Sequence, residues 1–291
     1  MTPIEKIMDL ARWAPSGDNT QPWRFEFLNP TTVIVHTFDC SKETVQDYKG
    51  NYSQFAVGCL LESCRIAASR YGSLKIEQNN NDFTLTLIPN DNPVINELEP
   101  YIYTRVTNRF PFSRKKISEN LKSELGKNLD KGWTLAWYEE NYLPKIAKLM
   151  FVFDLLAQPA TKGIIDWNAK TSKYRLADET LGLDSLNLWM ARQIFKSPFL
   201  TKWVFHRLGG KYISAFFGFF LPSLRTGAHV ALMPPYELKT REDFIKAGEN
   251  FQRFWLECTK NNIALQMESG PIIFSRYARD SVNPYDKSKE K

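Results

Sequence analysis

Two short polar segments carry the residues with which this chain could bind a flat, charged small molecule. The first, PSGDNTQPW over 15–23, places the carboxamides of Asn19 and Gln21 two residues apart in a turn. The second, RVTNR, places Arg105 and Arg109 four residues apart. A carboxamide presents both a hydrogen-bond donor and an acceptor, and an arginine fork suits phosphate. The two segments therefore predict a ligand that has a polar ring edge and a phosphate group.

A flavin nucleotide has these features. Its pyrimidine edge alternates donors and acceptors, its ring faces need apolar cover, and its phosphate needs a cation. We expect Ser16, Asn19 and Gln21 at the ring or the ribityl chain. The two arginines would meet on one anion if their segment were helical or tightly turned, with Thr107 donating a further hydrogen bond.

Both segments also have a purely structural interpretation. Asn19 and Gln21 could do no more than satisfy backbone groups in a turn, and Arg105 and Arg109 could form a solvated face. Trp23 is expected to pack in the core rather than against a ligand. The residue types alone leave these alternatives open.

The segment APSGDNTQPWRFEF, residues 14–27, resembles the mark of the flavin-binding nitroreductase family, Ala-Pro-Ser-Ser/Gly-x-Asn-x-Gln-Pro-Trp. RVTNRFPF is similar to that family's arginine-containing phosphate motif, in the form of the branch with two lobes in one chain. AGENFQRFWLECTKNNIALQ, residues 247–266, is similar to its late helix. The resemblance implies an α+β sandwich, with a central, mainly antiparallel sheet flanked by helices and two pseudo-repeated lobes.

The resemblance also implies that FMN lies between the two lobes and takes hydride from NAD(P)H for a small-molecule, electron-poor acceptor. The flavin carries that chemistry, so no catalytic side chain and no metal are assigned. The residues implied at the cofactor are Pro15, Ser16, Gly17, Asn19, Gln21, Arg105, Thr107 and Arg109. A single phosphate motif predicts one FMN site per chain, in a monomer or a homodimer.

The long aromatic stretch at about 162–225 motivates an alternative function. As a lid it would cover the flavin. The chain would then be a flavin-binding or storage protein, or a degenerate relative without catalysis. Its most apolar run, residues 212–222, is shorter than the roughly 20 residues that a membrane-spanning helix needs. A buried helix or a lid is favoured there over a face that touches a membrane.

Composition sets limits on partners and compartment. The 291 residues carry a net charge of +6, which suits an anionic small ligand and does not by itself indicate nucleic acid. The four cysteines lack a CxxC pair, so we expect buried free thiols rather than a zinc cluster. With no signal segment at the N-terminus, a reducing cytoplasm is the expected location.

The sequence pattern predicts mixed α and β elements, with hairpins dominating the strand pairs. A capped helix opens the chain, and two hairpins enclose an apolar helix at 54–72 that is expected to end at Gly72. A long helix with a Thr240–Asp243 cap comes late. The predicted organisation is an N-terminal lobe at 1–99, a C-terminal lobe at 100–280 containing the 162–225 insertion, and a disordered tail at 281–291.

Overall fold

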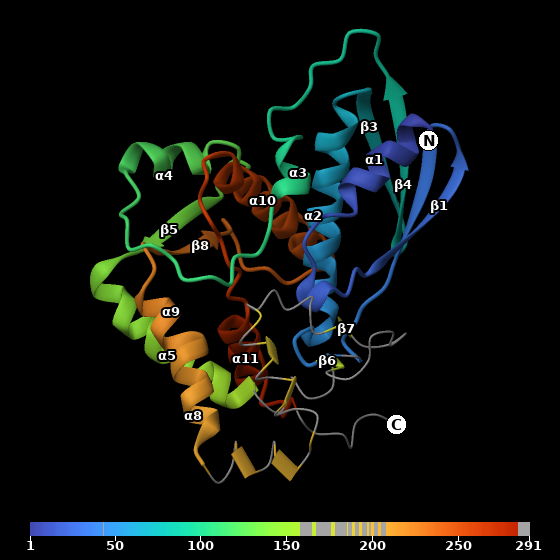
Figure 1. Cartoon of the computed structure of the whole chain (residues 1–291). Helices are drawn as coiled ribbons and strands as arrows, with labels where there is room; N and C mark the ends of the chain where they lie inside the picture. The colour runs from blue at the N-terminus through green and yellow to red at the C-terminus, as the bar shows by residue number, and fades with distance from the viewer. Residues whose placement is uncertain are drawn as a thin grey trace.

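The computed structural model describes residues 1–42, 44–157 and 208–284, together with short pieces between 158 and 207. Its sheets and central helices lie in layers (Figure 1). The helices are α1 Pro3–Ala11, α2 Asn51–Ala68, α3 Tyr101–Thr104, α4 Glu119–Gly126, α5 Leu143–Ala157, α8 Gly210–Ala215, α9 Leu221–Leu224, α10 Arg241–Lys260 and α11 Gly270–Arg279. Tighter or wider turns are η1 Gly17–Asn19, η2 Tyr48–Gly50, η3 Glu140–Tyr142 and the π-helical η7 Phe216–Phe220. The strands are β1 Trp23–Asn29, β2 Thr32–Thr37, β3 Gly72–Asn79, β4 Asp82–Pro89, β5 Thr134–Tyr138, β6 Ile165–Asp166, β7 Leu176–Ala177 and β8 His229–Met233.

The N-terminal sheet has the order β1-β2-β4-β3, and all its neighbours are antiparallel. Successive side chains of a strand point to opposite faces of the sheet, and one face is turned to the core. On that face Val33 and Val35 of β2 and Leu85 of β4 are fully buried. Val33 lies opposite Leu85 in the register, so the two side chains belong to the same buried face. Both predicted hairpins are confirmed.

The first helix forms for the reasons that its sequence suggests. Thr2 accepts a hydrogen bond from the backbone N–H of Glu5, and the Glu5 side chain accepts one from the backbone N–H of Thr2. Ile4, Ile7 and Met8 then fall on one face and are buried. The capping box at Thr240 and Asp243 of α10 is formed in the same way.

Helix α2 is buried along most of its length, as its apolar girth predicts. Its limits differ from the prediction, since it begins at Asn51 and ends at Ala68. Gly72 does not end the helix but starts β3, with a φ of 145°. A Cβ there would lie 2.1 Å from the carbonyl oxygen of Ile88. The glycine is therefore required by the close approach of β4 and not by a helix terminus.

Helices α2 and α10 cross in the middle of the molecule, backbone against backbone (Figure 1). A Cβ added at Gly58 would lie 1.9 Å from the carbonyl oxygen of Ile245. One added at Gly248 would lie 1.9 Å from the carbonyl oxygen of Phe55. Two glycines, one on each helix, thus permit a contact that no other residue type allows. This crossing fixes the position of α10 against the N-terminal core.

The opposite face of α10 packs on the C-terminal elements, where Leu125 of α4 meets Phe254 and Cys258 in a smaller core. Strands β5 and β8 form an antiparallel pair behind it. The larger core crosses residue 100, because it contains Ile102 of α3 and Leu256 of α10. The order of layers is the first sheet, α2 with α1, α10, and then β5 with β8 (Figure 1).

The α+β class is confirmed, with antiparallel pairing in the main sheet. Among the described residues, the strands lie in separate sheets, and helices lie between the four-stranded sheet and the β5–β8 pair. The second sheet has two strands where the first has four, so its size does not match that of a repeated lobe. The nitroreductase-type sandwich and the pseudo-repeat remain predictions.

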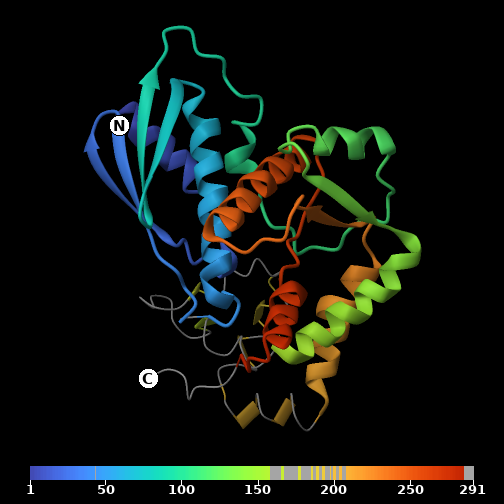
Figure 2. The ribbon, with the colours of Figure 1, turned by 180° about the vertical axis from the view of Figure 1, so that it is seen from behind.

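An arm of helices extends below β5 and β8 and consists of α5, α8, η7, α9 and α11 (Figure 2). Aromatic contacts hold it together: Phe153 lies 6.0 Å from Phe219 and 5.5 Å from Phe274, ring centre to ring centre. Most of the predicted insertion at 162–225, up to residue 207, lies outside the described residues. Residues 285–291 of the predicted tail also lie outside them. Within the described part of the chain, no helix has the length and apolar character needed to cross a membrane.

Candidate functional site

The turn after α1 has an unusual backbone. Asn19 and Gln21 both adopt positive φ, at 56° and 47°. The backbone N–H of Gln21 donates to Ser16 Oγ at 3.0 Å, and its side-chain amide donates to Asn19 Oδ1 at 3.3 Å. Left-handed conformations cost free energy for non-glycine residues and are concentrated at functional sites. The turn is thus held in one strained shape by its own side chains.

The turn presents its polar groups to solvent and its apolar end to the core. The Asn19 and Gln21 side chains are exposed, whereas Pro22 and Trp23 are buried. Trp23 packs in the main core, which confirms the structural interpretation made for it. A Cβ at Gly17 would meet nothing within 4 Å, so no described neighbour requires a glycine there.

Arg105 brings the two predicted segments together. It follows α3 in an extended conformation, and its Nη2 donates to the carbonyl oxygen of Trp13 at 3.3 Å. Its guanidinium lies over the ring of Trp255 in α10, 4.4 Å from the ring centre. Because Trp13 lies only two residues before Pro15, the guanidinium is next to the start of the carboxamide turn.

The Arg105 guanidinium is buried without a counter-ion. Its Nε and Nη1 atoms are inaccessible and have no hydrogen-bond partner, and no carboxylate among the described residues pairs with it. Burial lowers the pKa of the guanidinium to about 10, so it remains charged at neutral pH. Burial also raises the pKa of the neighbouring Cys59 thiol, which therefore stays neutral. A buried, unpaired cation is costly, and a bound anion would remove that cost.

The rest of the RVTNR segment is extended, not helical. Thr107 forms a parallel bridge with Leu265, and the Asn108 N–H donates to the Leu265 carbonyl at 3.0 Å. Four extended residues span roughly 13 Å. The helical spacing that would bring Arg109 beside Arg105 is absent, and Arg109 is exposed. Arg105 is therefore the arginine that the structure places at the turn.

Aromatic side chains surround this position, and neither sequence motif includes them. Trp13 and Tyr103 make an edge-to-face contact with ring centres 4.8 Å apart. Both are partly open to solvent, with 42% and 60% of their surface exposed. The available signal was their position, since Trp13 precedes the Pro-Ser turn and Tyr103 precedes Arg105. Exposed aromatic rings next to a buried cation can cover the face of a planar ligand.

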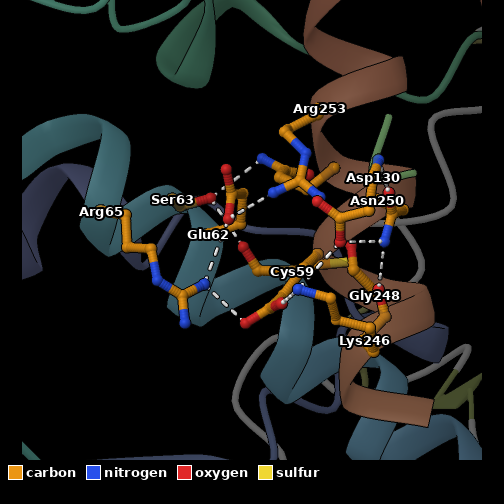
Figure 3. Close-up of polar contacts among 11 residues, drawn as sticks. Cys59, Glu62, Ser63, Arg65, Asp130, Lys246, Gly248, Asn250 and Arg253 are labelled. Carbon is orange, nitrogen blue, oxygen red and sulfur yellow. Dashed lines mark hydrogen bonds and ion pairs between the residues drawn. The ribbon is translucent and has the colours of Figure 1, made fainter. Parts of the chain in front are cut away.

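A second cluster of charged groups lies at the α2–α10 crossing, and its members are paired (Figure 3). Arg253 lies 3.0 Å from Glu62 and 3.0 Å from Asp130, measured between nitrogen and oxygen. Arg65 lies 2.5 Å from Glu249. Arginine–carboxylate pairs of this kind bridge elements that are far apart in the sequence. This network joins α2, α10 and the loop before β5, and it does not resemble an acid–base pair.

Two hollows in the described surface lie elsewhere. One of about 660 Å³ lies between the start of α5 and the segment after α9, with Arg114 and Lys116 at its edge. One of about 230 Å³ lies between α2, β3 and α10, beside Arg65. Neither is lined by residues 15–23 or 105–109. The described residues contain no group of histidine, cysteine and acidic side chains arranged for a metal, and the four cysteines are free and buried.

Comparisons with known proteins find no family model that matches this chain and no curated protein with significant similarity to it.

Proposed function

We propose that the chain binds FMN and acts as an FMN-dependent NAD(P)H oxidoreductase of nitroreductase type. The observation that carries this proposal is the buried Arg105 guanidinium, whose Nε and Nη1 lack partners beside the strained turn at Ser16 to Gln21. An anion is the missing partner that this cation calls for. The turn offers the hydrogen-bonding groups that a flavin ring or ribityl chain would use.

The residues present fit the parts of FMN. Arg105 would hold the phosphate, with Thr107 as a nearby hydroxyl donor. The exposed carboxamides of Asn19 and Gln21 would serve the polar edge or the hydroxyl groups. Trp13 and Tyr103 would cover a ring face, and the net charge of +6 favours an anionic nucleotide. Pro15, Ser16, Gly17 and Arg109 remain proposed members of the site.

When bound, FMN would accept hydride from a nicotinamide and pass it to an electron-poor small molecule. The side chains would bind and orient the cofactor. Arg105 keeps its positive charge at neutral pH, because its pKa of about 10 lies well above that range. Such a charge suits the phosphate, while amide donors of Asn19 and Gln21 would stabilise negative charge that develops on the ring. No side chain of this site needs to act as an acid or a base.

A second candidate is a flavin-binding or storage protein without turnover. The Asn19 and Gln21 carboxamides already bond to each other, and neither of the two hollows reaches the turn. In this candidate the flavin fills the space beside the turn, and a second substrate has no access to it. This alternative shares the binding site with the first candidate and differs only in reactivity.

The test uses the full chain and the absorbance of flavin. FMN is added, unbound FMN is removed by gel filtration, and the retained flavin is measured. We expect near-stoichiometric FMN in the wild type, little in Arg105→Met, and unchanged retention in Arg12→Met. Arg12 is a matched control because it is exposed, close to the turn and paired with Asp9.

Addition of NADH or NADPH without oxygen then separates the two candidates. Bleaching of the flavin band supports the oxidoreductase, and an unchanged band supports the binding protein. Absence of retained flavin in the wild type contradicts both.

A further inference from the structure

Two helical segments of the arm that pack together expose apolar side chains, which we call the arm face. Its members on α5 and on α8–η7 are Leu149, Val152, Leu156, Ile213, Phe216 and Phe217. Ile213 and Phe217 have 58% and 63% of their surface exposed. The expectation of a buried helix at 212–222 is therefore wrong for these side chains. The run packs on α5 through other residues, among them Phe220, whose ring centre lies 6.4 Å from that of Phe151.

The α5 part of the arm face is a continuous stripe. Leu149, Val152 and Leu156 are spaced by three and four residues, so they lie along one side of the helix. The opposite side is buried and includes Ala147 and Met150. An ordinary surface helix carries polar residues on the side away from the core. Exposed apolar stripes of this kind mark interaction surfaces.

The α8–η7 part is shaped by a local departure from the α-helix. Residues Phe216–Phe220 form a π-helical turn, a feature found frequently at functional sites. Within it Phe216 stacks on Phe220, with ring centres 5.2 Å apart, while Phe217 is turned to solvent. Tyr212, one turn earlier, is also half exposed, and the Lys211 ammonium lies 4.8 Å from its ring centre.

The charges on the arm face have one sign. Residues 208–225 contain no Asp or Glu, and Lys211 and Arg225 are their charged residues. Helix α5 exposes Lys145 and Lys148, whereas its one acidic residue, Asp154, is buried. The apolar stripe is thus bordered by cations. This pattern of lysines around exposed aromatic and aliphatic side chains is typical of segments that lie in a membrane interface.

We propose that the arm face binds peripherally to the surface of an anionic lipid bilayer. The apolar side chains would enter the interface and the lysines would attract acidic headgroups. A second copy of the chain suits the surface less well, because two such faces would oppose like charges. The proposal does not depend on flavin binding, since it rests on residues of the arm alone.

The test is vesicle flotation with the full chain. Vesicles of pure phosphatidylcholine are compared with an equal mixture of phosphatidylcholine and phosphatidylglycerol. We expect binding to the anionic vesicles only, weakened by added salt. The pair Phe216→Ser and Phe217→Ser, and separately the pair Lys145→Glu and Lys148→Glu, should each reduce binding at least about tenfold.

The matched control is the pair Val94→Ser and Ile95→Ser. These residues are exposed and apolar but lie in the loop between β4 and α3, at the end of the molecule away from the arm (Figure 1). The lysine variants and the control should keep the wild-type melting temperature, because their side chains are exposed. The phenylalanine variant loses the stack of Phe216 on Phe220, so its flotation is measured well below its own melting temperature. Failure of the wild type to float, equal binding to both vesicles, or full binding by the arm variants would overturn the proposal. Sedimentation showing a dimer that the phenylalanine variants dissociate would instead assign the face to a second copy.

Discussion

Two arginines pack against the central helices, and their surroundings are opposite. Arg253, on α10, lies 3.0 Å from carboxylate oxygens of both Glu62 and Asp130. Arg105, after α3, has no carboxylate partner among the described residues. Both guanidinium groups have two buried nitrogens without a hydrogen bond, so the absence of a counter-ion is what sets Arg105 apart. The first is an ion-paired structural contact. The second has no counter-ion and lies beside a strained turn and two exposed aromatic rings.

The difference shows how a structural charge can be told from a functional one. Buried charges in a stable fold are paired, because an unpaired one costs free energy. Arg253 is paired within the chain, whereas Arg105 is left without a counter-ion. We infer that the counter-ion of Arg105 is a ligand that binds from solution.

The largest loss of stability is expected from closing the space between the central helices. In Gly248→Ala, the new Cβ would lie 1.9 Å from the carbonyl oxygen of Phe55. Because the obstacle is backbone, the helices must separate. We expect the free energy of unfolding to fall by more than about 3 kcal/mol, measured by urea denaturation. Gly17→Ala, where the Cβ meets nothing within 4 Å, should change it by less than about 0.5 kcal/mol. Equal stabilities of the two variants would refute the proposed crossing.

The paired arginine should be needed for stability. Arg253→Met removes a cation from between Glu62 and Asp130 and leaves the buried Glu62 carboxylate with one partner fewer. A loss of about 3 kcal/mol in the free energy of unfolding is expected. Retention of FMN per folded molecule should not change. A stable Arg253→Met protein would mean that the network shown in Figure 3 contributes little.

The unpaired arginine should behave in the opposite way. Arg105→Met keeps much of the contact with Trp255 and removes a buried cation without a counter-ion. We expect the ligand-free protein to gain up to about 1 kcal/mol in the free energy of unfolding. Thermal melts without ligand would measure it. A loss of 2 kcal/mol or more, on the scale of about 1–3 kcal/mol for a buried hydrogen bond, would make Arg105 a structural residue after all.

The smallest effect concerns an exposed carboxylate that already has its partners. Hydrogen bonds from Lys49 and then Tyr48 lower the pKa of Asp280 to about 2. The carboxylate is ionised more readily in the folded chain, so its contribution is present above the unfolded pKa of 3.8 and is lost as the pH falls towards 2. Asp280→Asn should therefore be less stable than wild type at pH 6, and the gap should close between pH 4 and 2. A gap that does not depend on pH would contradict this.

The elements set by local sequence could be predicted. The hairpins around Pro30 and Asn80 and the capping boxes at Thr2 and Thr240 depend on residues a few positions apart. The crossing at Gly58 and Gly248 could not be predicted, because nothing in the local pattern pairs residues 190 positions apart. The order of the layers follows from that crossing and was missed for the same reason.

The candidate site was predicted in part. The sequence pointed to Ser16, Asn19 and Gln21, and the structure shows them bonded in one turn. The spacing of Arg105 and Arg109 suggested that both would contact one anion. The extended backbone instead carries Arg109 away from Arg105. Burial of one guanidinium depends on Trp255, far along the chain. Such a property arises from tertiary packing, and sequence spacing does not report it.

The most direct test of the central claim compares FMN with riboflavin, which has the same ring and no phosphate. Binding of each to the wild type and to Arg105→Met is measured by titration of flavin fluorescence. If Arg105 holds the phosphate, the wild type should bind FMN at least about tenfold more tightly than riboflavin. In Arg105→Met the two ligands should then bind equally. Equal affinities in the wild type, or a preference for FMN that survives the substitution, would contradict a phosphate site at Arg105.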